Sequence, residues 1–399
     1  MHEQTLERLA ELAAGYAANV QPGQVVSVGA DLGQEEMARA VAGASYRRGA
    51  RFVEVRYFDP FVKRARIEHA AAETLDYVPT WYGERLLALG RDHGASIALS
   101  GPTAPGALGG LDPERIGRDQ LPFVKELLTV IGERLLNWTV VPCPHPAWAA
   151  LVHPGLGAEA ALDRLWVDVV HVCRLDEPDP VAAWRRRAGE LGAIAARLNE
   201  LRLDAVRFEG PGTDLTVGLL PSTAWSTAQM TTVDGVEHLA NLPTEEVFAT
   251  PDPGRAEGRV RSTRPLMLLD GTVIRGLEVR FEGGRAVEFG ADEGAAVLRA
   301  RAALDEGASR LGEVALVDRE SRIGQLGTVF YETLIDENAV SHIALGDGDD
   351  VALTDEDRAR RNRSAIHVDF MIGGDEVSVT GIARDGGLVP VLRDGRWQV

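Results

Sequence analysis

Acids and histidines in the last third of the chain stand where an ordinary protein core would hold apolar residues. They lie in residues 244–246, 311–316 and 366–370 and at His342. Burying a carboxylate or an imidazole among apolar residues costs free energy unless a cation pairs with it. A pair of metal ions would compensate all of these groups. The sequence therefore points to hydrolysis by water that metal ions activate.

His367 and Asp369 are separated by one residue in an apolar segment. In a strand, Ile366, Val368 and Phe370 would share one face. His367 and Asp369 would then point to the other face, roughly 7 Å apart at the backbone, which lets both converge on one or two cations. The alternative is an amphipathic strand whose polar face lies in water, and for an isolated His-x-Asp that alternative is the commoner one.

Glu313 lies in the otherwise apolar run of residues 311–317, which is typical of a buried strand. An unpaired acid at such a position would be costly, or would stay protonated with a raised pKa. The alternative is an edge position at the start of the strand, with Glu313 exposed.

Glu245 and Glu246 are adjacent, so a regular strand would direct at most one of them into a given pocket, whereas a loop could present both. The alternative for this pair is a helix start that Thr244 caps, with acids near its positive end.

His342 follows Asp336, which could cap a short helix that ends at Gly346. A lone histidine in such a segment is usually structural. The whole set is more informative than any member, because three acids and two histidines fit a two-metal hydrolase site with mixed nitrogen and oxygen ligands.

The elements that must position these residues fall into two groups. The first half alternates between helix and strand, which predicts an α/β domain with a mostly parallel sheet. The predicted strands are residues 24–28, 52–57, 97–100 and 139–141, and the predicted helices are residues 3–19, 34–48, 122–137, 158–172 and 180–201.

From residue 204 the pattern changes to short strands with turns between them, interrupted by one long predicted helix at residues 293–310. The predicted strands are residues 206–209, 215–219, 273–282, 286–290, 314–317, 366–371 and 376–380. This pattern predicts an α+β domain with antiparallel pairing, and this domain would carry the metal site. We therefore expect domains at residues 1–203 and 204–399.

Composition limits the classes of function. The net charge of −18 disfavours nucleic acid and anionic membrane surfaces as partners. Only two cysteines occur, and the first residues have neither a basic nor an apolar signal region, so we expect a cytoplasmic protein. The arginines at residues 185–187 are expected to form a solvated helix face. The turn at residues 29–33 lacks a phosphate-binding fingerprint.

Five ordered blocks closely resemble the thermophilic aminopeptidase family of metallopeptidases, the aminopeptidase T and aminopeptidase S type (M29). They are residues 241–248, 311–317, 330–339, 341–346 and 364–373. The resemblance is strongest from residue 206 onward and extends more weakly into the first half.

The resemblance implies an enzyme that removes N-terminal residues from peptides with two divalent ions such as zinc or cobalt. It also implies a homodimer with an enclosed chamber, in which the first domain gates access or forms the dimer. The implied metal ligands are Glu313, His342, His367, Asp369 and one of the adjacent glutamates 245 and 246, of which Glu246 is preferred and Glu245 is the alternative. Glu245 would then be a general base or a group that supports the ligands.

Among the implied ligands, Glu313 is the best candidate to bridge the two ions. The amine of the substrate would be anchored by the second ion or by acids such as Asp347 or Asp349. One departure concerns a tyrosine that family members carry soon after the Ala-Leu-Gly at residues 344–346. This chain has Asp-Gly-Asp-Asp at residues 347–350, so a function of that tyrosine would need another donor. The rival readings are another metal-dependent amidohydrolase and a metal-binding protein with little catalysis.

Overall fold

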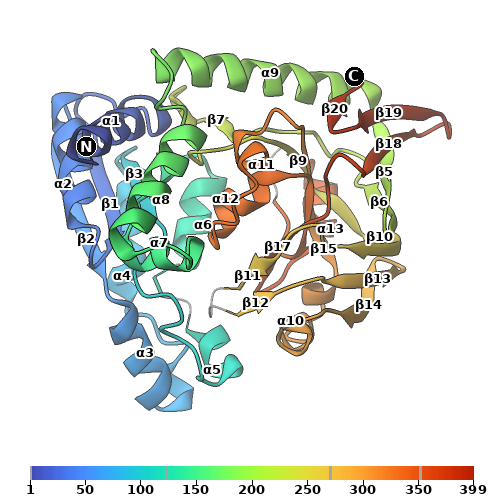
Figure 1. Ribbon diagram of the computed structural model, residues 1–399, viewed down its shortest axis with the longest axis horizontal. Helices are drawn as coiled ribbons and strands as arrows, with labels where there is room; N and C mark the ends of the chain where they lie inside the picture. The colour runs from blue at the N-terminus through green and yellow to red at the C-terminus, as the bar shows by residue number, and fades with distance from the viewer. Residues whose placement is uncertain (1, 120, 123, 269–271, 350–352) are drawn as a thin grey trace. The chain divides into compact units, whose positions relative to one another are not determined.

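The computed structural model describes residues 2–119, 121–122, 124–268, 272–349 and 353–399 (Figure 1). The chain forms two compact units. The first comprises Met1–Arg185 and Ala228–Pro243, and the second comprises Arg186–Thr227 and Thr244–Val399. The division falls inside helix α9 (Pro180–Leu201) instead of near residue 203, and residues 228–243 join the first unit.

The first unit contains a four-stranded parallel sheet in the order β2-β1-β3-β4, as the alternating pattern predicts. Its strands are β1 (Val25–Asp31), β2 (Phe52–Phe58), β3 (Ala95–Ser100) and β4 (Asn137–Pro142). The helices are α1 (His2–Leu12), α2 (Glu35–Arg47), α3 (Pro60–His69), α4 (Thr80–Arg91), α5 (Pro113–Arg118), α6 (Lys125–Gly132), α7 (Pro146–Val152) and α8 (Ala158–Val172). A small hairpin, β7 (Gln229–Thr231) and β8 (Glu237–Leu239), belongs to the same unit.

The carboxyl ends of β1 and β3 form the position where parallel sheets of this kind often bind ligands. Here the amide of Gln34 donates to the carbonyl oxygens of Ser100 at 3.3 Å and Gly101 at 3.2 Å, and its side chain is buried. The helix that follows begins with two acids, Glu35 and Glu36, whose charges oppose an anion. This arrangement agrees with the lack of a phosphate-binding fingerprint.

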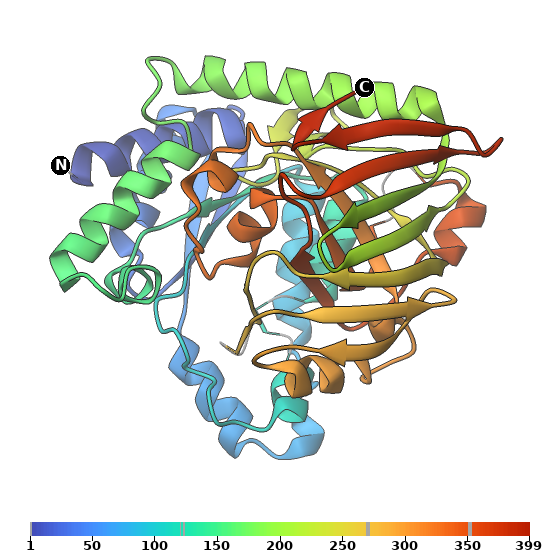
Figure 2. The ribbon, with the colours of Figure 1, turned by 45° about the vertical axis from the view of Figure 1, so that its right-hand side comes forward.

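The second unit is rich in antiparallel pairing (Figure 2). Its eight-stranded sheet has the order β14-β13-β10-β6-β5-β18-β19-β20, and a separate four-stranded sheet has the order β17-β16-β15-β9. The large sheet comprises β5 (Leu203–Gly210), β6 (Thr213–Leu219), β10 (Pro251–Arg261), β13 (Glu278–Glu282), β14 (Arg285–Gly290), β18 (Ser378–Ala383), β19 (Leu388–Arg393) and β20 (Arg396–Trp397). The small sheet comprises β9 (Glu246–Ala249), β15 (Leu311–Val317), β16 (His342–Gly346) and β17 (His367–Met371).

Short elements complete the second unit. They are the pair β11 (Leu266–Met267) and β12 (Val273–Ile274), the helices α10 (Ala295–Ala302), α11 (Arg322–Leu326), α12 (Thr333–Asp336) and α13 (Asp355–Arg360), and the 3₁₀ turns η3 (Gly307–Ser309) and η4 (Glu337–Ala339). Within the described part of the chain, no helix has both the length and the apolar character needed to cross a bilayer.

Three predicted elements in the second unit are wrong. The single strand predicted at residues 273–282 is divided into β12 and β13, which belong to different sheets. The long helix at residues 293–310 is only the eight-residue α10 followed by the turn η3. Gly307 packs so closely on the backbone of Arg363 that an added Cβ would lie 2.0 Å from its carbonyl oxygen, and this contact needs a turn there. The expected short helix ending at Gly346 is strand β16, in which buried Ile343 and Leu345 alternate with His342 and Ala344.

The buried His238 on β8 makes the stability of the first unit dependent on pH. Its ring lies 6.3 Å from that of Trp138, and burial lowers its pKa from an ordinary 6.5 to about 4. Between these values the unfolded chain binds a proton that the folded chain does not, so stability decreases as the pH falls. We expect a loss of about 2 kcal/mol between pH 7.5 and pH 5 from this residue. Urea unfolding of His238→Phe should lack this loss.

The matched control is His69→Phe, because His69 is exposed. It should keep the pH dependence of the unchanged protein. An equal loss of stability in His238→Phe and in the unchanged protein would contradict the prediction.

Candidate metal centre

The small sheet β17-β16-β15-β9 has one polar face. Directly paired residues of antiparallel strands share a face. Glu313 pairs with Ala344, which pairs with Asp369 on its other side, and in the next row Ala315 pairs with His342. By alternation the same face carries all five predicted ligands, Glu246, Glu313, His342, His367 and Asp369. Small alanine side chains stand between them.

The opposite face of this sheet is apolar. Its residues are Val247, Ala249, Val314, Leu316, Ile343, Leu345, Val368 and Phe370, and all of them belong to one buried core. Burying a side chain of this size contributes about 1.5–3 kcal/mol. Because a slip of one residue would turn every side chain to the other face, this core fixes which residues reach the polar side.

Two histidines approach the two oxygens of Glu313. His342 Nε2 lies 3.6 Å from Glu313 Oε1 and 3.2 Å from Glu246 Oε2. His367 Nε2 lies 3.6 Å from Glu313 Oε2 and 3.2 Å from Asp369 Oδ1. Two groups of candidate ligands result, one around each histidine, and both contain Glu313. A carboxylate with one oxygen directed to each group has the arrangement of a bridging ligand.

The donor atoms of the cluster fit a cation. Glu246 Oε2, His342 Nε2 and Asp369 Oδ1 are buried, and none makes a hydrogen bond of regular geometry among the described residues; their neighbours at 3.2 Å are other members of the cluster. Buried polar atoms without partners are uncommon and costly. Imidazole nitrogens combined with carboxylate oxygens suit divalent ions such as zinc or cobalt.

The backbone orients His367 for such a role. Its Nδ1 lies 2.8 Å from the carbonyl oxygen of Asp347, which can only accept a hydrogen bond. In the neutral form of His367 the proton therefore belongs on Nδ1, which leaves the lone pair of Nε2 directed at Glu313 and Asp369. The side chain of His367 is 40% exposed, whereas that of His342 is buried, so solvent reaches the cluster on the His367 side.

The crowding of carboxylates shifts the pKa values of the cluster. Burial alone would lower the pKa of His342, but hydrogen bonds and charges from Glu246 and Glu313 raise it well above its usual value. Burial raises the pKa of Glu313. Burial would raise the pKa of Asp369, but the charges of His367 and His342 and hydrogen bonds from His367 and Glu337 together lower it. The imidazoles thus hold protons that a divalent cation would displace.

Glu337 was missed as a site residue. It lies on η4, is buried, and forms a third candidate group with His342 and Asp369. Burial and the charges of Asp369 and Glu246 raise the pKa of Glu337 well above its usual value. The available signal was a second acid directly after Asp336 inside the block at residues 330–339.

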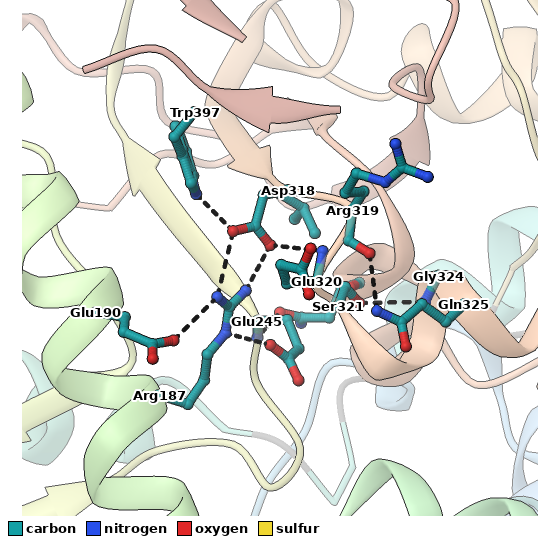
Figure 3. A network of polar contacts seen from close by, with 12 residues as sticks. Arg187, Glu190, Glu245, Asp318, Arg319, Glu320, Ser321, Gly324, Gln325 and Trp397 are labelled. Atoms are coloured by element: carbon teal, nitrogen blue, oxygen red, sulfur yellow. Dashed lines mark hydrogen bonds and ion pairs between the residues drawn. The ribbon is translucent and has the colours of Figure 1, made fainter. Parts of the chain in front are cut away.

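Glu245 points away from the cluster and belongs to none of the three candidate groups. Its carboxylate accepts a hydrogen bond from Arg187 Nε at 2.6 Å (Figure 3). The predicted solvated face at residues 185–187 is therefore wrong for Arg187, which is buried, while Arg185 and Arg186 are exposed.

The acids after β16 also have partners. Asp347 Oδ1 lies 3.2 Å from Arg361 Nη1 and accepts a hydrogen bond from the Ser364 amide. The carbonyl oxygen of Asp349 accepts from the hydroxyl of Thr250. Asp350 lies outside the described residues.

A buried cluster in which acids and histidines share one carboxylate is typical of metal-dependent hydrolases. The family model of the thermophilic metalloproteases (M29) matches residues 2–397. The chain therefore belongs to this family of metallopeptidases, and it is a hydrolase.

Relatives of similar length support this membership. Aminopeptidase T of Thermus aquaticus is 44% identical, with 99% of each chain covered. Aminopeptidase PepS of Streptococcus thermophilus is 36% identical over 100% of this chain and 98% of its own. The solved structure of wild-type AmpT from Thermus thermophilus covers 100% of both chains with a TM-score of 0.91 and 42% identity.

Removing divalent ions should destabilise the protein, because ions that bind only the folded cluster favour folding. We expect dialysis against a chelator to lower the Tm by on the order of 5 °C and added cobalt to restore it. His342→Ala should abolish the response to cobalt, while His69→Ala, at an exposed position, should keep it. Calorimetry measures the Tm of the unchanged protein and of each variant with and without cobalt. A Tm that is insensitive to chelator and cobalt would contradict a metal centre.

Proposed function

We propose that the chain is a two-metal aminopeptidase that hydrolyses N-terminal residues from peptides. The observation that carries this proposal is the pair of ligand groups that share Glu313. The proposal is supported by relatives that match over nearly the whole chain and are named aminopeptidases. The two buried, unpaired cysteines suit a reducing cytoplasm.

The candidate ligands would divide between two ions. Glu246 and His342 would hold one ion, His367 and Asp369 the other, and Glu313 would bridge them. Bound zinc or cobalt ions would lower the pKa of a water molecule and polarise the scissile carbonyl. The sheet contributes by holding the five side chains on one face before any substrate arrives.

Proton transfer is assigned to Glu337. Its carboxylate lies with His342 and Asp369 but outside both groups that contain Glu313. Such a carboxylate can accept the proton of the attacking water and deliver it to the departing amine. The resemblance suggested Glu245 as the base, but the carboxylate of Glu245 accepts a hydrogen bond from Arg187 instead. Asp347 is held by Arg361, so we do not assign the amine of the substrate to it.

A homodimer is also part of the proposal. The edge strand β2 of the first unit exposes Phe52 and Tyr57, and the neighbouring helices expose Phe61 and Trp81. An exposed edge strand can pair with another chain, and clustered exposed aromatic side chains mark interaction surfaces. This unit would then form the dimer or gate the chamber.

The substrate class can be tested with free and N-acetylated peptides. We expect turnover of unblocked di- and tripeptides and at least about 100-fold slower turnover of the acetylated forms, because the free amine contributes to transition-state binding. His367→Ala and Glu313→Ala should lose activity together with bound cobalt.

The two rival functions predict different results. Equal turnover of acetylated peptides would favour another metal-dependent amidohydrolase. Tight metal binding without turnover of either set would favour a metal-binding protein with little catalysis.

The role of Glu337 can be separated from metal binding. We expect Glu337→Gln to retain both ions and to lower kcat by about 10²–10⁴-fold, because the amide cannot accept the proton. Glu376→Gln, at an exposed position, is the matched control and should keep kcat. Stopped-flow assays with metal analysis distinguish the outcomes. Normal turnover in Glu337→Gln would rule out the assignment, and loss of an ion would make Glu337 a ligand.

A further inference from the structure

Arg187 on α9 lies between two buried carboxylates (Figure 3). Its Nε donates to Glu245 at 2.6 Å, and Nη2 and Nη1 donate to the two oxygens of Asp318 at 2.7 and 3.2 Å. Trp397 Nε1 donates to the same Asp318 at 2.7 Å. On the exposed side, Glu190 Oε2 lies 3.7 Å from Arg187 Nη1.

The guanidinium is the cation that makes this arrangement possible. The side chain of Glu245 is 0% exposed and that of Asp318 4% exposed, so neither carboxylate has solvent to stabilise its charge. Without Arg187, two buried acids would lose this compensation. The planar fork also fixes the direction of both carboxylates, which a lysine could not do equally well.

This network joins the backbone segments that carry candidate ligands. Glu245 directly precedes Glu246. The amide N–H of Glu245 donates to Asn338 Oδ1 at 2.7 Å, and Asn338 directly follows Glu337. The hydroxyl of Ser321 donates to the Asn338 carbonyl at 2.7 Å, which holds that segment from the other side.

The strand pairing extends the link. Asp318 directly follows Val317, and Val317 pairs with Glu246 across β15 and β9. Arg187 therefore holds the residues next to both partners of this pair. A displacement of Glu245 or Asp318 would move the start of β9, and with it the carboxylate of Glu246.

We propose that Arg187 is a positioning residue for the metal centre. It binds Glu245 and Asp318 on one side of the backbone, and this fixes Glu246 and Glu337 on the other side. Glu245 is then part of the support and does not transfer protons. The inference rests on the proposed two-metal function.

The experiment is a cobalt titration of the full-length protein, followed by visible absorption and by calorimetry. Arg187→Met should weaken cobalt binding at least about tenfold, in the range found for groups that support metal ligands, and should change the cobalt spectrum. Arg187→Lys should give a smaller loss. Arg186→Met, at the exposed neighbouring position on the same helix, should bind cobalt like the unchanged protein.

Two milder variants keep the inference testable where Arg187→Met does not fold. Trp397→Phe removes one donor to Asp318, and Glu245→Gln removes one charge from the network. Each should weaken cobalt binding by about three- to tenfold in protein whose circular dichroism is unchanged. Unchanged cobalt affinity and spectrum in the folded variants would overturn the positioning role.

Two further outcomes distinguish failure of the proposed function from failure of the positioning role. Unchanged protein that binds no cobalt would refute the proposed function itself. Glu245→Gln with normal cobalt binding and a kcat reduced about 100-fold or more would make Glu245 the proton carrier and would overturn the inference.

Discussion

The candidate centre depends on the burial of one face of a four-stranded sheet. The strands β9, β15, β16 and β17 place their apolar residues in the core of the second unit, and alternation sends the intervening residues to the other side. The strand register fixes the positions of the candidate ligands, because the register that buries Val314 and Ile343 also aligns Glu313 and His342. The free energy that orders the centre is therefore hydrophobic, while its chemistry is electrostatic.

The buried carboxylates on the two sides of the backbone at residues 245–246 are compensated in two different ways. On one side Arg187 gives Glu245 and Asp318 a permanent positive partner that no change of pH near neutrality removes. On the other side Glu246 and Glu313 have only protonated imidazoles and, in the proposed function, exchangeable ions. A permanent positive charge can hold carboxylates in place, whereas an exchangeable ion can take part in catalysis. The adjacent glutamates 245 and 246 thus have different roles despite their identical chemistry.

Much of the centre could be predicted from sequence, because alternation along a strand is a local property. His367 and Asp369 are two residues apart, and Glu313 interrupts an apolar run, so the reason for each is visible in its own segment. The parallel sheet of the first unit and the antiparallel pairing of the second follow from similarly local patterns. Glu337 and Arg187 could not be predicted in this way, since each acquires its role from residues distant in sequence. The failed helix at residues 293–310 has the same cause, because the contact of Gly307 with Arg363 is tertiary.

The alanines of the polar face bear on how related chains should be judged. Ala344 stands between Glu313 and Asp369 in the paired rows of the sheet, and Ala315 stands beside His342. A leucine at either position would occupy the volume that, in the proposed function, two ions and a peptide bond need, although every charged group would still be present. An inventory of ligands is therefore an incomplete guide to which members of the family retain a working centre, and the space between the ligands has to be compared as well.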